Sequence, residues 1–331
     1  MNSKKKELGQ FFTKKNIWLT DPVQKFIKSN FRGIILDPFA GAGDILQAVF
    51  IMLKSKVKLV GFDIDKNLKW KFNDSLNCIP IIKNGFIVTN PPYLSKNSCK
   101  RNKFNQTYNK YFMQCKHEDL YMIALEKMIQ TGLPGIAVVP ETFINSSFPK
   151  HKINLVVIIE PNPFDDTEVP ICVVCFNEKK IQSFSDDYLI YKNYDLIGKY
   201  SELFKSVPNP NKILKDIRFN DKFGNIAIRG IDSTNPEHKI KFCLVGEINY
   251  DLNKISSSSR SITVVSTKIE YKNSQLIRLI NNCNLILNKF RSKTKDVLLS
   301  PFKGNNKNGV RRRRLDYFIA RQIISKAIET I

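Results

Sequence analysis

Between residues 33 and 176, apolar runs of strand length alternate with segments whose apolar residues have helical spacing. The strand-like runs are 33–37, 58–65, 85–90, 136–140, 153–160 and 169–176, and the helix-like segments are 44–53 and 118–130. Continuous apolar runs indicate strands that are buried on both faces of a mostly parallel sheet. The sequence therefore predicts an α/β fold with helices on both faces, in which ligands bind beyond the carboxyl ends of the strands.

The texture of the chain changes after about residue 178, where strands become hard to place and Asn, Ser and Lys increase. A chain of 331 residues is long enough for two domains. We therefore expect one domain over residues 1–180 and a second, smaller domain over residues 181–331.

The chain is strongly basic, with 53 Lys and Arg against 30 Asp and Glu and a net charge of +23. An excess of this size in a chain with a real apolar core favours a polyanionic partner, most simply nucleic acid. An AT-rich genome, which enriches Lys, Asn and Ile together, is the alternative explanation. Scattered cysteines, the lack of a secretory signal and the lack of a long apolar stretch favour a cytoplasmic protein with no membrane contact.

Two segments at predicted strand ends are typical of a nucleotide-like ligand. The sequence DPFAGAGD (37–44) follows one strand and begins a helix, and its glycines allow backbone amides to approach a ligand closely. Asp63 ends the next strand, where an acid can accept hydrogen bonds from both hydroxyls of a ribose. Together they indicate an adenosine-bearing cofactor, although the glycine segment alone could be a structural turn.

The segment VTNPPY (88–93) directly follows the third strand and is the most specific motif of the chain. Its two prolines stiffen the backbone and restrict the conformation of Asn90. They therefore hold a side-chain carbonyl and a backbone carbonyl close together beside an aromatic ring. Such a corner can accept both hydrogens of a planar NH₂ group while the ring stacks on its heterocycle. A plain Pro-rich turn is the alternative.

Taken in order, GQFFT (9–13), DPFAGAGD, GFDID (61–65), NPPY (90–93) and VVPETF (138–143) resemble the gamma class of N(6)-adenine DNA methyltransferases of type II restriction–modification systems. The resemblance spans about residues 9–176. It implies a Rossmann-like methyltransferase sheet and the cofactor S-adenosyl-L-methionine. The further C-terminal domain would then recognise the DNA target.

The resemblance also implies roles for individual residues. Asn90, Pro91, Pro92 and Tyr93 would form the catalytic corner, with Phe164 and Tyr93 stacking on opposite faces of a flipped adenine. PNPFDD, which contains Phe164, would otherwise be an ordinary turn, and the segment of Asp74 would otherwise be a polar turn. The residues that would bind the cofactor are Phe12, Thr13, Asp37, Pro38, Ala40, Gly41, Gly43, Asp63, Ile64 and Asp74.

Two basic segments are candidates for DNA contact. Arg311, Arg312, Arg313 and Arg314 precede a helix-like pattern near the C-terminus, and Lys100, Arg101 and Lys103 lie in a segment, 95–112, that is basic with interleaved aromatics. Because the latter lacks apolar periodicity, we expect a mobile loop over the DNA. A solvated basic face is the alternative for the arginines.

The sequence thus predicts an enzyme that methylates the exocyclic amine of adenine in double-stranded DNA. The resemblance implies a partner restriction endonuclease of the same specificity and a monomeric enzyme. Two alternatives stay open: a methyltransferase of the same fold that acts on ribosomal RNA or a protein glutamine, and a DNA-binding protein with a relic pocket. We expect no metal, because the only C-x-x-C pair, Cys172 and Cys175, lies inside a predicted strand.

Overall fold

The computed structural model describes residues 16–54, 57–162, 168–177 and 187–331. Its contacts divide the chain into two compact units, the first ending at Tyr200 and the second running from Ser201 to Ile331. The division falls after the boundary expected at residue 180. The reason is that two further strands, within residues 189–199, join the sheet of the first unit.

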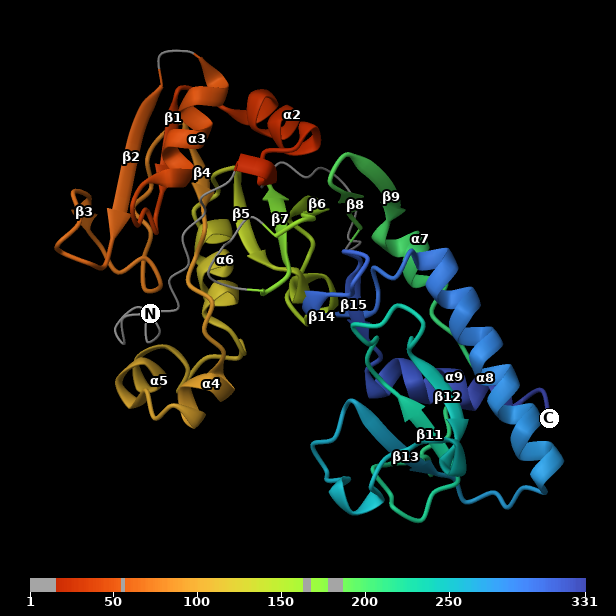
Figure 1. The fold of residues 1–331 in the computed structure, drawn as a ribbon. Helices are drawn as coiled ribbons and strands as arrows, with labels where there is room; N and C mark the ends of the chain where they lie inside the picture. Colours follow the sequence, from red (N-terminus) through yellow and green to blue (C-terminus); the bar gives the residue numbers. More distant parts are fainter. Residues whose placement is uncertain (1–15, 55–56, 163–167, 178–186) are drawn as a thin grey trace. The chain divides into compact units, whose positions relative to one another are not determined.

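The first unit is built on a mixed sheet, whose strands lie side by side in Figure 1. Their order is β3-β2-β1-β4-β5-β7-β6-β8-β9. Strands β1 to β5 run parallel, β7 is antiparallel to both of its neighbours, and β8 and β9 close the edge as a hairpin. The strands are β1 (Ile34–Asp37), β2 (Lys58–Asp63), β3 (Lys71–Phe72), β4 (Gly85–Thr89), β5 (Gly135–Pro140), β6 (Ile153–Ile158), β7 (Ile171–Phe176), β8 (Leu189–Lys192) and β9 (Asp195–Lys199).

Helices cover both faces of this sheet, as the sequence predicts. On one face, η1 (Asn16–Trp18), α2 (Asp21–Asn30) and α3 (Asp44–Leu53) contribute buried side chains to one core cluster with alternate residues of β1, β4, β5 and β7. The helix α6 (Leu120–Gln130) packs against β5 but contributes no residue to that cluster. We therefore place α6 on the opposite face.

The basic segment 95–112 forms two short helices, α4 (Lys96–Arg101) and α5 (Asn105–Tyr111), so the expectation of a mobile loop is wrong. The N-cap Ser95 accepts a hydrogen bond from the backbone nitrogen of Ser98 at 3.1 Å. Cys99 and Phe112 are fully buried. The N-cap and these two buried side chains therefore stabilise the helices. Neither feature gives the apolar repeat by which a helix is predicted from sequence.

The second unit combines a small antiparallel sheet, a two-stranded hairpin and two longer helices. The sheet order is β10-β13-β11-β12, and α8 packs against both β12 and α9. The elements are α7 (Tyr200–Phe204), which spans the division, β10 (Arg218–Phe219), β11 (Ile226–Arg229), β12 (Lys241–Leu244), η3 (Val245–Glu247), η4 (Leu252–Lys254), β13 (Ile262–Ser266), α8 (Asn273–Thr294), β14 (Ser300–Asn305), β15 (Arg311–Arg314) and α9 (Tyr317–Ile328). Within the described residues, none of the helices has the length and apolar character needed to cross a membrane.

Candidate functional site

The carboxyl ends of the parallel strands β1, β2 and β4 meet at one edge of the sheet, and each ends in a polar side chain. Asp37 ends β1, Asp63 ends β2 and Thr89 ends β4. The hydroxyl of Thr89 donates a hydrogen bond to Oδ1 of Asp37 over 2.5 Å. This bond joins the glycine-rich segment to the residue that directly precedes Asn90, so two motifs 52 residues apart in the sequence form one site.

Asp37 is a buried acid, with 1% of its surface exposed. The pKa of its carboxyl is raised to about 7, mainly by burial and to a smaller extent by the nearby charge of Asp63. Hydrogen bonds from Thr89 and from the backbone nitrogen of Phe39 act in the opposite direction. Groups whose pKa is shifted by burial in this way are common at binding and catalytic sites.

The glycine-rich loop is held by the acid of the neighbouring strand. Oδ2 of Asp63 accepts a hydrogen bond from the backbone nitrogen of Gly41 over 2.8 Å, and Oδ1 accepts one from the nitrogen of Asp65 over 2.9 Å. Gly41 and Gly43 have φ angles of 52° and 93°, a region that favours glycine. Asp63 therefore fixes the loop and keeps acceptor capacity for a ligand hydroxyl.

A tryptophan that the motif reasoning missed packs against the same loop. Trp70 donates from its indole nitrogen to the carbonyl of Gly41 over 2.8 Å. A Cβ atom at Gly43 would lie 2.8 Å from the ring of Trp70, and one at Gly61 would lie 2.4 Å from it. Two glycines are thus needed to admit this ring. Trp70 is 29 residues from Gly41, so no local pattern indicates the contact.

The NPPY corner follows β4 directly. Pro91 is buried, while Asn90, Pro92 and Tyr93 are half-buried. The hydroxyl of Tyr93 donates to the carbonyl of Val138 on β5 over 2.7 Å. The Tyr93 ring meets the Tyr121 ring edge-on, with centroids 6.5 Å apart. Burial, together with nearby Cys172 and Tyr121, raises the pKa of Tyr93 well above its usual value, so its hydroxyl stays a donor.

Asp74 makes its contacts with α5. Its Oδ2 accepts from Nζ of Lys110 at 2.6 Å and from the hydroxyl of Tyr111 at 3.0 Å, and Asn77 donates to the same atom. The hydrogen bond to Asp74 raises the pKa of Lys110, and burial raises the pKa of Tyr111 to about 12. The predicted cofactor-binding acid is therefore linked to the basic segment that follows NPPY.

The remaining cofactor residues fall in two groups. Pro38, Ala40 and Gly43 are buried in the loop, and Ile64 is half-buried directly after β2. Phe12, Thr13 and Phe164 lie outside the described residues. Within the part of the chain that the structure describes, no group of three His, Cys, Asp or Glu side chains could hold a metal ion.

The two basic segments predicted to contact DNA differ in the exposure and direction of their side chains. Lys100, Arg101 and Lys103 are exposed on α4 and the turn after it. The four arginines 311–314 form strand β15, so consecutive side chains point to opposite faces of the hairpin. Arg311 and Arg313 are buried, whereas Arg312 and Arg314 are half-buried.

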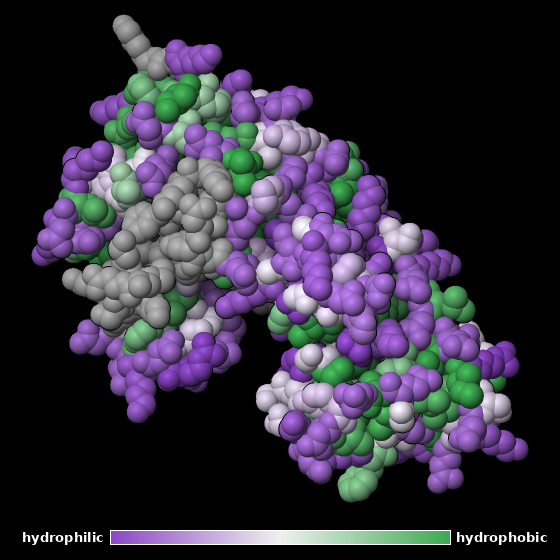
Figure 2. All heavy atoms as spheres, viewed as in Figure 1, coloured by the Kyte–Doolittle hydropathy of each residue, from purple (hydrophilic) through white to green (hydrophobic). Residues whose placement is uncertain are grey.

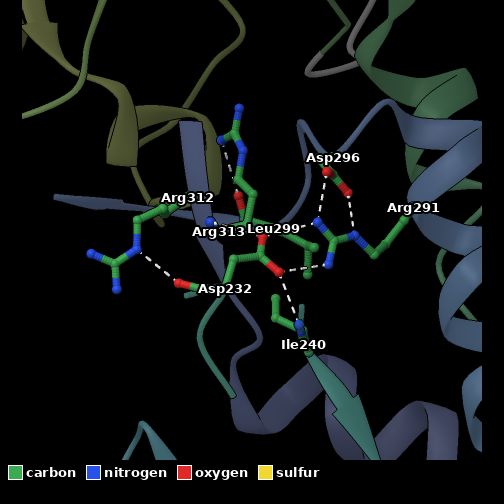
Figure 3. A network of polar contacts seen from close by, with 7 residues as sticks. All are labelled: Asp232, Ile240, Arg291, Asp296, Leu299, Arg312 and Arg313. Atoms are coloured by element: carbon green, nitrogen blue, oxygen red, sulfur yellow. Dashed lines mark hydrogen bonds and ion pairs between the residues drawn. The ribbon is translucent and has the colours of Figure 1, made fainter. Parts of the chain in front are cut away.

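Two of these arginines take part in a polar network around Asp232, shown in Figure 3. Nε of Arg312 donates to the carbonyl of Asp232 over 2.7 Å, and the backbone nitrogen of Arg313 donates to Oδ2 of Asp232 over 3.2 Å. Arg291 on α8 forms two-pronged pairs with Asp232 and with Asp296, at 2.8–2.9 Å. The network ties the hairpin to α8, which is a structural role.

Comparison with known proteins adds the following. No protein-family model matches the sequence, and no curated protein matches it. Similar solved structures include a putative class I S-adenosylmethionine-dependent methyltransferase from Listeria monocytogenes, with 14% identity, a TM-score of 0.39 and coverage of 54% of this chain and 65% of that one.

Two further similar structures are a modification subunit of a putative type I restriction enzyme from Vibrio vulnificus and a type I restriction–modification methyltransferase subunit from Streptococcus thermophilus. Their identities are 16% and 15%, and both have TM-scores of 0.39. The matches cover 56% and 55% of this chain and 47% of each of those chains. At these values the similarities establish neither activity nor substrate.

The fold class itself is confirmed by the strand order of the first unit. Compared with the doubly wound order 3-2-1-4-5-6, this sheet has one antiparallel strand, β7, inserted between β5 and β6. This is the mostly parallel, Rossmann-like sheet with helices on both faces that the sequence predicts.

Proposed function

We propose that this protein is a site-specific DNA methyltransferase, which transfers a methyl group from S-adenosyl-L-methionine to the exocyclic amine of adenine. The observation that carries the proposal is the hydrogen bond between Thr89 and Asp37, because it joins the NPPY corner to the glycine-rich loop. An amine-gripping motif and a nucleotide-type loop at one sheet edge are what a methyl transfer to nitrogen requires.

The residues at this edge fit the cofactor. Asp63 retains acceptor capacity for ribose hydroxyls, and the backbone of the Gly41–Gly43 turn is open enough for close approach. Asp37 supplies a buried carboxyl, whose ionised form a nearby positive charge would stabilise. When bound, S-adenosyl-L-methionine supplies an electrophilic methyl group on a positively charged sulfur.

The chain's own part in the chemistry is to hold the amine. The side-chain oxygen of Asn90 and the carbonyl of Pro91 would accept hydrogen bonds from the two N–H groups of the adenine amine. Those bonds favour a tetrahedral nitrogen, whose lone pair is then free to attack. Pro91 and Pro92 keep the two acceptors in place, so most of the rate enhancement comes from positioning and fixed dipoles. The amine proton leaves after transfer, and no general base is required before it.

The corner also stabilises a base outside the helix. Adenine in a duplex is stacked and paired, so its amine is reached only after extrusion, which costs a few kcal/mol. Tyr93 is held by its hydrogen bond to Val138 and by the edge of Tyr121, so its ring is fixed before a base binds, which supports the stacking role. Stacking of this kind contributes about 1–3 kcal/mol per base. Phe164 is proposed for the other face.

We propose that the second unit, with the exposed Lys100, Arg101 and Lys103 of the first, holds double-stranded DNA. The excess charge of +23 supports a polyanion as partner. A restriction endonuclease of the same specificity would be the functional counterpart, and methylation would protect the host DNA from it. We propose a monomer that acts in the cytoplasm.

The test is methyl transfer from labelled S-adenosyl-L-methionine to four substrates: duplex DNA, transfer RNA, ribosomal RNA and a release-factor protein. We expect label in duplex DNA alone, and N6-methyladenine after its digestion. Label only in one of the two RNAs would instead assign the same corner to an amine of that RNA, and label only in protein would assign it to a glutamine amide. Sequencing of methylated bases in DNA from expressing cells then gives the target site.

A further inference from the structure

Phe223, in the turn between β10 and β11, is exposed over 97% of its surface. Among the described large hydrophobic residues the next most exposed is Ile81, at 70%. Single exposed hydrophobic residues are common on protein surfaces. A nearly bare phenyl ring on an ordered turn is less common, and the construction of the turn shows how the ring is presented.

The turn is fixed to strand β13 by one carboxyl group. Oδ1 of Asp221 accepts from the backbone nitrogen of Phe223 over 3.1 Å, and Oδ2 accepts from the hydroxyl of Ser266 over 2.5 Å. The backbone of Asp221 bonds to Val264 on one side and Gly224 on the other. The hydrogen bonds from Ser266 and from the backbone of Phe223 lower the pKa of Asp221, and the bond from Ser266 has the largest effect. The carboxylate form therefore persists at neutral pH.

The backbone on either side of the ring is fixed. A Cβ atom at Gly224 would lie 2.3 Å from the carbonyl oxygen of Val265, so this position admits only glycine. Asn220 has a φ of 61°, and its side-chain amide donates to Ser257, Ser259 and Tyr317. Both ends of the turn are thus fixed while the ring between them is exposed to solvent.

The surroundings of the ring favour an anion. Lys222 is adjacent and exposed, and its Nζ donates to the carbonyl of Asn253 over 3.4 Å, at the loop that carries exposed Lys254 and Arg260. Two acids, Asp221 and Asp251, belong to the same two segments, and each accepts a hydrogen bond from a backbone nitrogen. In Figure 2, hydrophobic residues on the visible face of the second unit are scattered among hydrophilic ones. Three exposed cations, Lys222, Lys254 and Arg260, outnumber these two acids, and this local excess of positive charge favours a nucleic acid over an apolar protein patch.

We propose that Phe223 is a wedge that inserts into the base stack of duplex DNA, while Lys222 contacts a phosphate. This inference rests on the proposed function, since it assumes duplex DNA as substrate. Apolar side chains inserted at base steps unstack them, and the bent or opened duplex makes further contacts with the protein.

The test measures the affinity of the full chain for a duplex that contains its methylated site, by fluorescence anisotropy. We expect Phe223→Ala to weaken binding about tenfold, from the stacking value of one ring, and Phe223→Leu to retain most of the affinity. The matched control is Phe318→Ala, which removes another phenyl ring of the same unit that is 56% exposed. It should bind DNA as the wild-type chain does.

An abasic site, moved through the duplex one position at a time, locates the wedge. A base already missing removes the stacking that the wedge must break. The deficit of Phe223→Ala should therefore fall below twofold at one position and stay tenfold elsewhere. A melting temperature equal to that of the wild-type chain, measured by circular dichroism, shows that the variant is folded.

Two results would overturn the inference. These are wild-type affinity of Phe223→Ala for the intact duplex and an equal deficit at every abasic position. If the wild-type chain methylates DNA while Phe223→Ala changes nothing, only the wedge fails. If the wild-type chain neither binds nor methylates duplex DNA, the proposed function fails as well.

Discussion

Two buried carboxyl groups, Asp37 in the first unit and Asp232 in the second, have pKa values shifted in opposite directions. Burial opposes ionisation of both. At Asp37 burial dominates and raises the pKa to about 7, whereas at Asp232 the hydrogen bonds and charge of Arg291 outweigh burial and lower the pKa. The acid paired with arginine holds a hairpin to a helix. The acid bonded by uncharged donors lies at the sheet edge where a ligand is expected.

The largest effect on this comparison should come from Arg291→Met. The substitution leaves Asp232 and Asp296 close together without their shared cation. Removing one partner from a buried ion pair costs about 3–5 kcal/mol. Urea unfolding, followed by circular dichroism, should show that loss. Arg291→Met combined with Asp232→Asn should recover part of it, and an unchanged stability of the single variant would show that the network contributes nothing.

The second effect concerns the pH dependence of Asp37. Its pKa is about 7 in the folded chain against 3.8 for an ordinary aspartate, so between pH 4 and 7 the folded state binds more protons than the unfolded state. The contribution of Asp37 to the stability of the wild-type chain therefore falls as the pH rises from 4 to 7, and it stays lower above pH 7. The shift corresponds to as much as about 4 kcal/mol.

Asp37→Asn removes this titration. Relative to the wild-type chain, the variant should gain stability as the pH rises from 4 to 8, and melting temperatures measured across that range would check it. Asp232→Asn is the matched comparison, because the pKa of Asp232 is lowered in the folded chain. This variant should lose more stability at neutral pH than in acid. Parallel melting curves for Asp37→Asn and the wild-type chain would contradict the shift.

A third effect separates the ring of Tyr93 from its hydroxyl. Tyr93→Ala removes the surface proposed to stack on the flipped base. The lost stacking of about 1–3 kcal/mol should lower kcat/KM for methyl transfer to DNA roughly 5- to 150-fold. Tyr93→Phe keeps the ring and loses only the bond to Val138, which contributes about 1 kcal/mol. Equal losses of activity in both variants would show that the ring does not stack on the substrate.

The smallest effect should come from Thr89→Val. It removes the donor to Asp37 while keeping nearly the same shape, at a cost of about 1 kcal/mol. Because this bond lowers the pKa of Asp37, its loss should move the pH transition of stability upwards. Thermal melts from pH 5 to 9 measure that shift, and a transition that moves down would contradict the role of Thr89.

The sheet and its first site residues are predictable because burial on both faces leaves a continuous apolar run. The helix expected over residues 44–53 is α3 with the same bounds, and the strands begin and end within a few residues of the predicted runs. Strand direction then determines which motifs meet. Parallel strands place Asp37, Asp63 and Thr89 at one edge without any further information.

The second unit was not predictable in the same way, because its contacts are short strands and distant partners. Strands β10 to β13 have two to five residues each, too few for a period to appear. The arginines of β15 form a strand by pairing with β14, and Arg312 and Arg313 also donate to Asp232, about 80 residues earlier, which no local pattern indicates. The contact between Asp74 and α5 is hidden for the same reason.

The central claim is that Asn90 grips the amine that receives the methyl group, and one pair of measurements on Asn90→Ala tests it. Methyl transfer to duplex DNA is quantified as N6-methyladenine by mass spectrometry, and S-adenosyl-L-methionine binding is measured by calorimetry on the same preparation. The account predicts that transfer falls below detection while cofactor affinity stays within a few fold of the wild-type value. Undiminished transfer, or transfer and binding lost to the same extent, would contradict it.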